Sequence, residues 1–268
     1  YQNRPSTHEV GMFKIIPIRS KYKSWSVYFD FKNISIINAN VTGKSAGVLI
    51  CGSSSTSNDY SNATGTRNYI SVENCFVSGQ VTSILNGSLT SEYYNTGVIG
   101  TIDTDSGGTY SIGTHYLTMT NTVAVLDVNI QISDSPNKTY DFGLLGIKKS
   151  PQIGPAMYQR ITNSCVHANV TVDKTDDTAI VNIYGVVPEN LSNDINNVYV
   201  NNSYENIASK EGVNFFYFTP NSEYTSNLIA NHEKGKVRGI DFDNVHYLTD
   251  EQMKDLTYYK NLGWTIYE

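Results

Sequence analysis

The sequence predicts an all-β protein: a right-handed parallel β-helix (solenoid) of about five coils that ends in a short helix and a capping strand. Three observations support this fold. A segment centred on one asparagine recurs along the chain, a glycine followed by two apolar residues recurs between these segments, and the apolar face of the chain changes at each asparagine. One coil is therefore a glycine-led strand, a variable polar loop and two strands hinged at an asparagine.

The asparagine-centred segment has a fixed apolar pattern. Apolar residues stand four and two positions before the anchor and one, three and seven positions after it, as in Ile70, Val72, Cys75, Val77 and Val81. A strand of period two changes its buried face only where the backbone turns, and asparagine tolerates the left-handed conformation that such a turn needs. We therefore predict five corner asparagines, whose side chains stack along the axis: Asn38, Asn74, Asn121, Asn163 and Asn197.

The glycine-led strand begins each coil. A glycine is followed by two apolar residues at five places, each of them upstream of the next anchor: Gly11, Gly47, Gly97, Gly143 and Gly185. We assign residues 1–230 to the repeats with their loops and residues 231–268 to a C-terminal capping segment. In that segment Thr249 with Gln252 predicts the start of a short helix, and residues 262–266 predict the capping strand.

Composition restricts the class of partner. Only 16% of the 268 residues are charged and the formal net charge is −6, so no basic surface for nucleic acid or anionic lipid is expected. No apolar run approaches the roughly 20 residues that a membrane-spanning helix needs. Because the chain begins with Tyr1 and no leader precedes it, we expect a processed product or an excised fragment.

The repeats resemble the GLUG-type (glycine-leucine-glycine) repeats of bacterial and protist surface proteins. The segment Ile70–Val81 carries the resemblance most fully, and the similarity extends over about residues 11–205 and the tail. The pattern departs in the last repeat, where Tyr199–Tyr204 replaces the apolar ladder and Val187-Pro188 replaces a second glycine. The resemblance implies a parallel β-helix, located outside the cell or at the cell surface, as part of an adhesin or beside a surface peptidase.

Catalysis and metal binding have weak support in the sequence. Two acidic clusters, Asp103/Asp105 and Asp173/Asp176/Asp177, could be the paired carboxylates of a glycoside hydrolase or the oxygen ligands of Ca²⁺. Both clusters lie in polar loops, where aspartate commonly serves turns. We expect no catalytic residues, no metal site and no cofactor, with Ca²⁺ at Asp173–Asp177 as the alternative.

Sequons and cysteines bear on the cellular location. Asn-x-Ser/Thr occurs at eight candidate N-glycosylation sites: Asn33, Asn40, Asn62, Asn86, Asn137, Asn169, Asn190 and Asn201. The apolar pattern places Asn33, Asn40, Asn169 and Asn201 on the outer face. Cys75 is expected to point inward and Cys165 outward; Cys51 and Cys75 could pair from adjacent coils or remain buried thiols.

The function expected from this architecture is structural. We expect a non-catalytic extracellular module that is a surface stalk, a filament subunit or an adhesin, and that carries glycans. Its partners would be copies of itself, other surface proteins or glycans, with the aromatic residues Phe215, Phe216, Tyr217 and Phe218 as the candidate contact. The alternative is a β-helix protein that binds or degrades polysaccharide.

Overall fold

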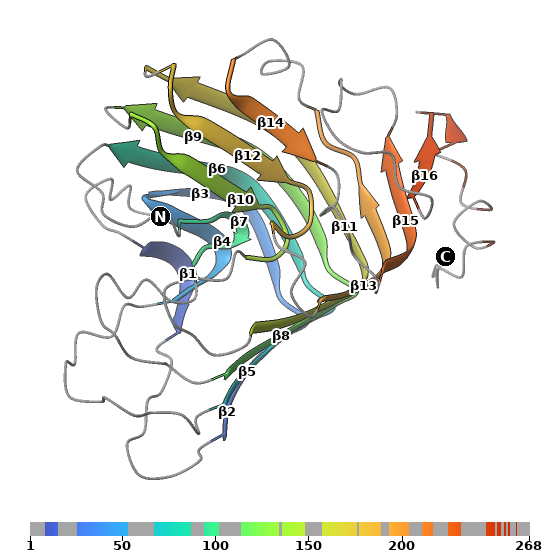
Figure 1. Cartoon of the computed structure of the whole chain (residues 1–268). Coiled ribbons are helices and arrows are strands. Elements are labelled where there is room, and N and C mark those ends of the chain that lie inside the picture. The colour runs from blue at the N-terminus through green and yellow to red at the C-terminus, as the bar shows by residue number, and fades with distance from the viewer. Residues whose placement is uncertain are drawn as a thin grey trace.

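The computed structural model describes residues 9–15, 26–52, 67–86, 94–101, 114–133, 136–147, 157–175, 177–188, 193–203, 211–216, 225–231, 245–249, 251–252, 255, 257 and 261. Sixteen β-strands form within these residues, and every pairing between them is parallel. The all-β class and the parallel pairing predicted from the sequence are confirmed. Figure 1 shows the strands lying side by side in successive layers from the N-terminal to the C-terminal end.

The asparagine-hinged strands form one 10-stranded sheet. Its main path joins β2 (Ser26–Lys32), β5 (Arg67–Glu73), β8 (Thr114–Thr120), β11 (Met157–Lys174), β13 (Asn193–Val200), β15 (Thr225–Asn231) and β16 (Val245–Leu248). A second path beyond the hinge joins β3 (Ser35–Gly43), β6 (Phe76–Asn86), β9 (Val123–Ser133) and the later half of β11. Successive repeats therefore pair before and after each hinge, and the sheet turns a corner between the two paths (Figure 1).

The glycine-led strands stack beside this sheet. The first group is β1 (Glu9–Ile15), β4 (Ser45–Gly52) and β7 (Thr96–Ile99); the second is β10 (Thr139–Gly143), β12 (Ile180–Tyr184) and β14 (Val213–Phe216). Gly11 pairs with Gly47 and Gly47 with Gly97, whereas Gly143 pairs with Tyr184. The Val98 N–H donates to the Leu144 carbonyl at 2.8 Å, which joins the two groups along the same direction.

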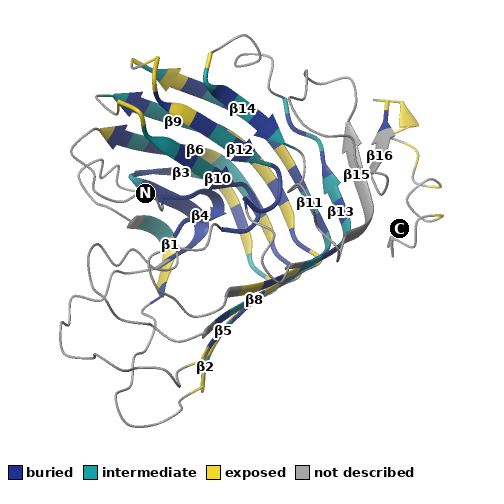
Figure 2. Cartoon of the chain, viewed as in Figure 1, coloured by how far each residue is buried: buried dark blue, intermediate teal, exposed yellow. Residues whose placement is uncertain are grey.

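One hydrophobic core lies between the hinged and the glycine-led strands. Its largest fully buried side chains include Tyr140, Phe142 and Phe215. Buried and exposed residues alternate along the hinged strands (Figure 2). The alternation changes phase at Asn74, because Ile70 and Val72 are buried before it and Cys75, Val77 and Val81 are buried after it. The predicted change of face is confirmed.

Two buried amide side chains connect the layers. Asn95 accepts a hydrogen bond from the Gly143 N–H at 2.6 Å through Oδ1, and its Nδ2 donates to the Ile99 and Gly143 carbonyls at 2.6 and 2.9 Å. Gln159 forms the same two-way pairing with the Ile147 backbone at 3.0 and 2.8 Å. These amides satisfy backbone groups that would otherwise be buried without partners.

The C-terminal segment differs from the prediction. The reciprocal capping bonds form, since the Thr249 N–H donates to Gln252 Oε1 at 3.0 Å and the Gln252 N–H donates to Thr249 Oγ1 at 3.3 Å. However, the structure gives no helix with defined bounds that begins at this cap, and β16 ends immediately before it. Of the residues after Gln252, only 255, 257 and 261 are described, and Thr257 and Asn261 have helical conformation. The expected capping strand at residues 262–266 lies outside the described residues.

Candidate functional site: the corners and the outer tyrosine ladder

The corners have the backbone that the sequence predicts. Asn38, Asn74, Asn121, Asn163 and Asn197 have φ of 55°, 53°, 51°, 47° and 52°. This is the left-handed region, which asparagine enters more readily than other residues with a side chain. The predicted left-handed turn is therefore confirmed at all five positions.

The first repeat contains a correction. Asn33, with φ 57°, occupies the corner opposite Asn74, because the pairing of β2 with β5 aligns Lys32 with Glu73. Asn38 instead lies at a register shift between β3 and β6, where its N–H donates to Ser78 Oγ at 3.3 Å. It is the extra residue of a β-bulge and not the first corner. The sequence alignment chose Asn38 because Ile34 and Ile36 stand four and two positions before it, as in the other repeats.

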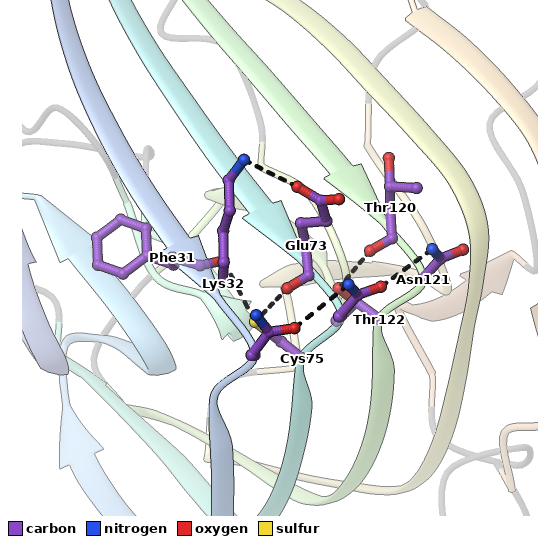
Figure 3. Close-up of polar contacts among 9 residues, drawn as sticks. Phe31, Lys32, Glu73, Cys75, Thr120, Asn121 and Thr122 are labelled. Atoms are coloured by element: carbon purple, nitrogen blue, oxygen red, sulfur yellow. Dashed lines mark hydrogen bonds and ion pairs between the residues drawn. The ribbon is translucent and has the colours of Figure 1, made fainter.

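The corner side chains form hydrogen-bonded ladders on the surface. Asn74 Nδ2 donates to Asn33 Oδ1 at 3.3 Å, and Asn121 Nδ2 donates to Asn74 Oδ1 at 3.1 Å. Asn197 Nδ2 donates to Asn163 Oδ1 at 3.0 Å in the later repeats. Figure 3 shows the amide of Asn121 beside the polar groups of the neighbouring repeats. Each amide thus fixes the position of the next.

An aromatic ladder runs along the outer face of the main path, five residues before the corners. Tyr28 is paired with Tyr69, Tyr69 with Tyr116, and Tyr116 with Tyr158. The ring centroids are 4.8, 4.7 and 5.0 Å apart, and the ring planes differ by 8°, 11° and 10°. Strand spacing in a sheet is about 4.8 Å, so the rings stack because the backbone register places them there.

The tyrosines remain accessible from outside. Tyr28, at the N-terminal end of the ladder, is 66% exposed, and Tyr158 at the other end is 39% exposed; Tyr69 and Tyr116 are half-buried between their neighbours. Stacking covers the ring faces within the row and leaves their edges toward the solvent. The ladder therefore presents a continuous aromatic edge across four repeats.

Polar pairs lie beside the ladder on the same face. The Lys32 Nζ lies 3.0 Å from Glu73 Oε2, and this hydrogen bond together with the charge of Glu73 raises the pKa of Lys32 (Figure 3). Arg160 Nε lies 2.8 Å from Asp194 Oδ2. These pairs join adjacent strands at exposed positions and provide a neutral, polar border to the tyrosines.

A second exposed surface is apolar and lies beyond the corners. Phe76 and Val123 are paired across β6 and β9 and are 37% and 38% exposed; Ile37 and Val125 lie near them on the same outer side. Cys165 follows Val123 in the same row on β11. The two outer faces thus differ: one has an ordered row of phenols, and the other has scattered apolar side chains.

The acidic clusters do not form a site among the described residues. Asp173 and Asp177 are exposed, whereas Asp103, Asp105 and Asp176 lie outside the described part of the chain. Lys174 Nζ donates to the backbone carbonyl of Asp177 at 3.1 Å. The side chain of a lysine therefore holds the loop in which Ca²⁺ was the alternative. No group of three or more His, Cys, Asp or Glu within the described ranges could hold a metal ion.

The sequon asparagines fall into three groups. Asn33, Asn40, Asn86, Asn137 and Asn169 are exposed; Asn201 is half-buried; Asn62 and Asn190 lie outside the described residues. Asn201 Nδ2 is 3.0 Å from His167 Nδ1, so its amide has a partner on the surface. Asn33 Oδ1 accepts a hydrogen bond from Asn74 Nδ2, so Asn40 and Asn169 are the best-placed acceptors on the outer face predicted to carry glycan.

None of the three cysteines is part of a disulfide. Cys75 is buried as expected, and its Sγ donates to the carbonyls of Phe31 and Glu73 at 3.4 Å. Cys51 is also buried, so the two residues that could have paired are separate core thiols. Cys165 is half-buried on the outer side, and burial raises the pKa of its thiol to about 12.

The aromatic contact expected near the C-terminal end is corrected. Phe215 is 1% exposed and belongs to the core, so its side chain cannot form a surface contact. Phe216 is half-buried and stacks on Tyr184 at 4.8 Å. Tyr217 and Phe218 lie outside the described residues. In a strand of period two, adjacent aromatics point to opposite faces, and this separates Phe215 from Phe216.

No family model, curated protein or solved structure matches this chain. In the part of the chain that the structure describes, no helix is long and apolar enough to cross a membrane. The tyrosine ladder was missed in the sequence although its signal was present. Each tyrosine stands five residues before a corner asparagine. With Asn38 taken as the first corner, the residue five positions before it is Asn33, so Tyr28 was not recognised as the first tyrosine of the row.

Proposed function

We propose that the protein is a non-catalytic structural or adhesive module located outside the cell or at its surface: a stalk, a filament subunit or an adhesin that carries N-linked glycans. One observation carries the proposal. The outward-facing tyrosines and the corner asparagines repeat in register from one repeat to the next. Such a surface is built by repetition along an axis, as in solenoids that offer long faces for contact.

The proposed architecture is a right-handed parallel β-helix of about five coils that ends in a capping strand. The stacking of the hinged strands and of the glycine-led strands in the same direction supports it. Right-handed connections are strongly favoured between parallel strands. The GLUG-type resemblance belongs to this proposal, and all five inward positions of its best segment, from Ile70 to Val81, are buried.

Secretion and glycosylation can be tested together. The chain is expressed through the secretory pathway of a eukaryotic host, and glycopeptides are mapped by mass spectrometry. We expect glycan at Asn40 and Asn169, lost one at a time in Asn40→Gln and Asn169→Gln. Asn129→Gln, which changes an outward asparagine outside any sequon, is the control and leaves the mass of glycan unchanged. An unglycosylated secreted protein would remove this part of the proposal.

The structural role is tested against the polysaccharide alternative. The purified protein is assayed for self-association by sedimentation, for adhesion when coated on beads, and for release of sugar ends from a panel of polysaccharides. We expect association or adhesion without sugar release. Release of sugar ends that disappears in Asp173→Asn would contradict the non-catalytic assignment and establish a carbohydrate-active enzyme.

A further inference from the structure

We propose that the tyrosine ladder is an oxidative cross-linking site, at which neighbouring phenols couple into dityrosine and join successive repeats covalently. The geometry of the row is the reason. Three consecutive pairs have ring centroids 4.7 to 5.0 Å apart and nearly parallel planes. Each phenol therefore has another phenol as its nearest aromatic neighbour across the strand pair, fixed by the backbone register.

The reaction requires a one-electron oxidant, and the class we name is hydrogen peroxide used by a haem peroxidase. Each of two tyrosines loses one electron and its phenolic proton and becomes a phenoxyl radical. The ortho carbons of the two rings form one C–C bond, and the ring hydrogens at those carbons move to the oxygens to restore both phenols. Two tyrosines thus release two protons and two electrons, which reduce one peroxide to two waters.

Accessibility and mobility both favour coupling. The ladder faces outward, so an oxidant reaches the ring edges, most readily at Tyr28 and Tyr158. The ortho carbons must approach from the stacking separation to bonding distance, and surface side chains can tilt about their two torsions to do this. A radical formed at either end also lies next to another phenol, so coupling within the row competes with coupling between molecules.

The consequence is a covalent strip that runs perpendicular to the strands. Links between Tyr28 and Tyr69, Tyr69 and Tyr116, and Tyr116 and Tyr158 would close loops of the chain whose ends are now joined only by noncovalent contacts between the paired strands. Cross-links that close long loops restrict the unfolded chain. The coupling depends only on the ladder, whereas its use as reinforcement rests on the proposed extracellular structural role.

The test oxidises the folded chain at low protein concentration with haem peroxidase and limiting peroxide, followed by peptide mapping. Trypsin alone cannot separate Tyr69 from Tyr116, because no Lys or Arg stands between them, so a glutamyl protease that cuts at Glu73 is added. We expect three cross-linked peptide pairs, each lighter by two hydrogens. The chain has twenty tyrosines, so the same oxidation of urea-unfolded protein gives the background pattern.

Two variants determine whether stacking is responsible. Tyr69→Phe keeps the ring and the fold but removes the phenol, so two of the three links should disappear and the Tyr116–Tyr158 link should remain. Phe216→Tyr places a second phenol against Tyr184, whose ring lies 4.8 Å from that of Phe216 at 15°, and should add one new link. Circular dichroism confirms that both variants are folded.

The proposal is overturned if folded and unfolded protein give the same cross-links, or if Tyr69→Phe leaves all cross-links unchanged. It is also overturned if the folded chain yields only links between molecules. Self-association and adhesion are measured separately on unoxidised protein, so failure of the coupling does not imply failure of the proposed function. Protein recovered from its native setting should contain the same three links, and their absence there would overturn the physiological role.

Discussion

The repeated glycine of the glycine-led strands is buried in every repeat after the first, whereas the repeated asparagine of the hinges lies at the surface. A Cβ on Gly97 would overlap the backbone carbonyl of Leu144 in the next repeat, so glycine is needed for space. At the hinge, Asn121 has room for its side chain, and asparagine is needed for its φ of 51° and for its bond to Asn74. The same fold thus uses two repeated residues for unrelated physical reasons, and substitutions should separate them.

The largest effect is expected from Gly97→Ala. The new methyl group meets main-chain atoms, which cannot move aside without breaking the pairing of β7 with its neighbours, so we expect a loss of about 3 kcal/mol or more in the free energy of unfolding. Urea unfolding of the parent protein and the variant measures this loss. Gly43→Ala is the control, because there the methyl group meets the side chain of Val10, which can rotate. Equal destabilisation by the two variants would contradict the backbone explanation.

A somewhat smaller effect is expected from Asn95→Ala, which removes a buried amide from between the glycine-led strands. The Gly143 N–H and the three carbonyls to which Asn95 Nδ2 donates would lose this partner, and an unpaired buried polar group costs about 1 to 3 kcal/mol. We expect destabilisation of about 3 kcal/mol in the same urea experiment. Asn129→Ala, at a half-buried outer position, should cost less than about 1 kcal/mol. A neutral Asn95→Ala would show that water replaces the amide.

At the hinge, Asn121→Ala should cost about 1 to 2 kcal/mol, because alanine adopts the left-handed conformation poorly and lacks the amide that bonds to Asn74. Asn121→Gly removes the same amide but accepts the backbone conformation, so it should be less destabilising than alanine. The difference between the urea midpoints of the two variants measures how much of the destabilisation comes from the left-handed backbone conformation. If glycine were as harmful as alanine, the ladder bond and not φ would explain the repeated asparagine.

The smallest effect is expected from the exposed pair beside the hinge. Glu73→Gln should lower the pKa of Lys32 toward its ordinary value, because the hydrogen bond to Glu73 is the main cause of its rise. Since the folded pKa is the higher one, the contribution of the pair is complete below the unfolded pKa of Lys32 and is lost as the pH rises through the folded pKa. NMR titration of the Lys32 side chain in the folded parent protein and in the folded variant gives the pKa of Lys32 in each.

A matched variant identifies the source of that shift. Asp30 also raises the pKa of Lys32, but it is the weakest of the contributing causes. Asp30→Asn should therefore lower the pKa of Lys32 by less than Glu73→Gln does. A larger change in Asp30→Asn would mean that long-range charge and not the hydrogen bond sets the pKa.

The hinged strands were predictable because their signal is local. A change of apolar phase at one asparagine needs only about twelve residues of sequence, and the corners at Asn74, Asn121, Asn163 and Asn197 lie where that signal places them. The first corner was predicted wrongly because the β-bulge at Asn38 adds one residue and so changes the apolar phase in the same way as a corner. The identity of the true corner, Asn33, depends on its pairing with the next strand, which a single repeat does not contain.

The candidate site was less predictable because it depends on register between distant segments. The stacking of Tyr69 on Tyr116 requires the two strands to align over an intervening loop of variable length. Phe215 and Phe216 form an aromatic cluster in the sequence, yet they point to opposite faces of β14, with Phe215 in the core. At the C-terminal end, the local capping bonds of Thr249 and Gln252 were predictable, whereas the pairing of β16 with β15 was not.

Variable loop length has a consequence for how such a chain can change over generations. Bonded corner asparagines are separated by 41, 47 or 34 residues, yet their side chains meet in the same way. Insertions and deletions between the strands are therefore absorbed without disturbing the register. A tandem duplication of one whole repeat would add about 4.8 Å to the length of the stack and preserve both ladders. Gene duplication can thus change the reach of this protein in small, equal steps.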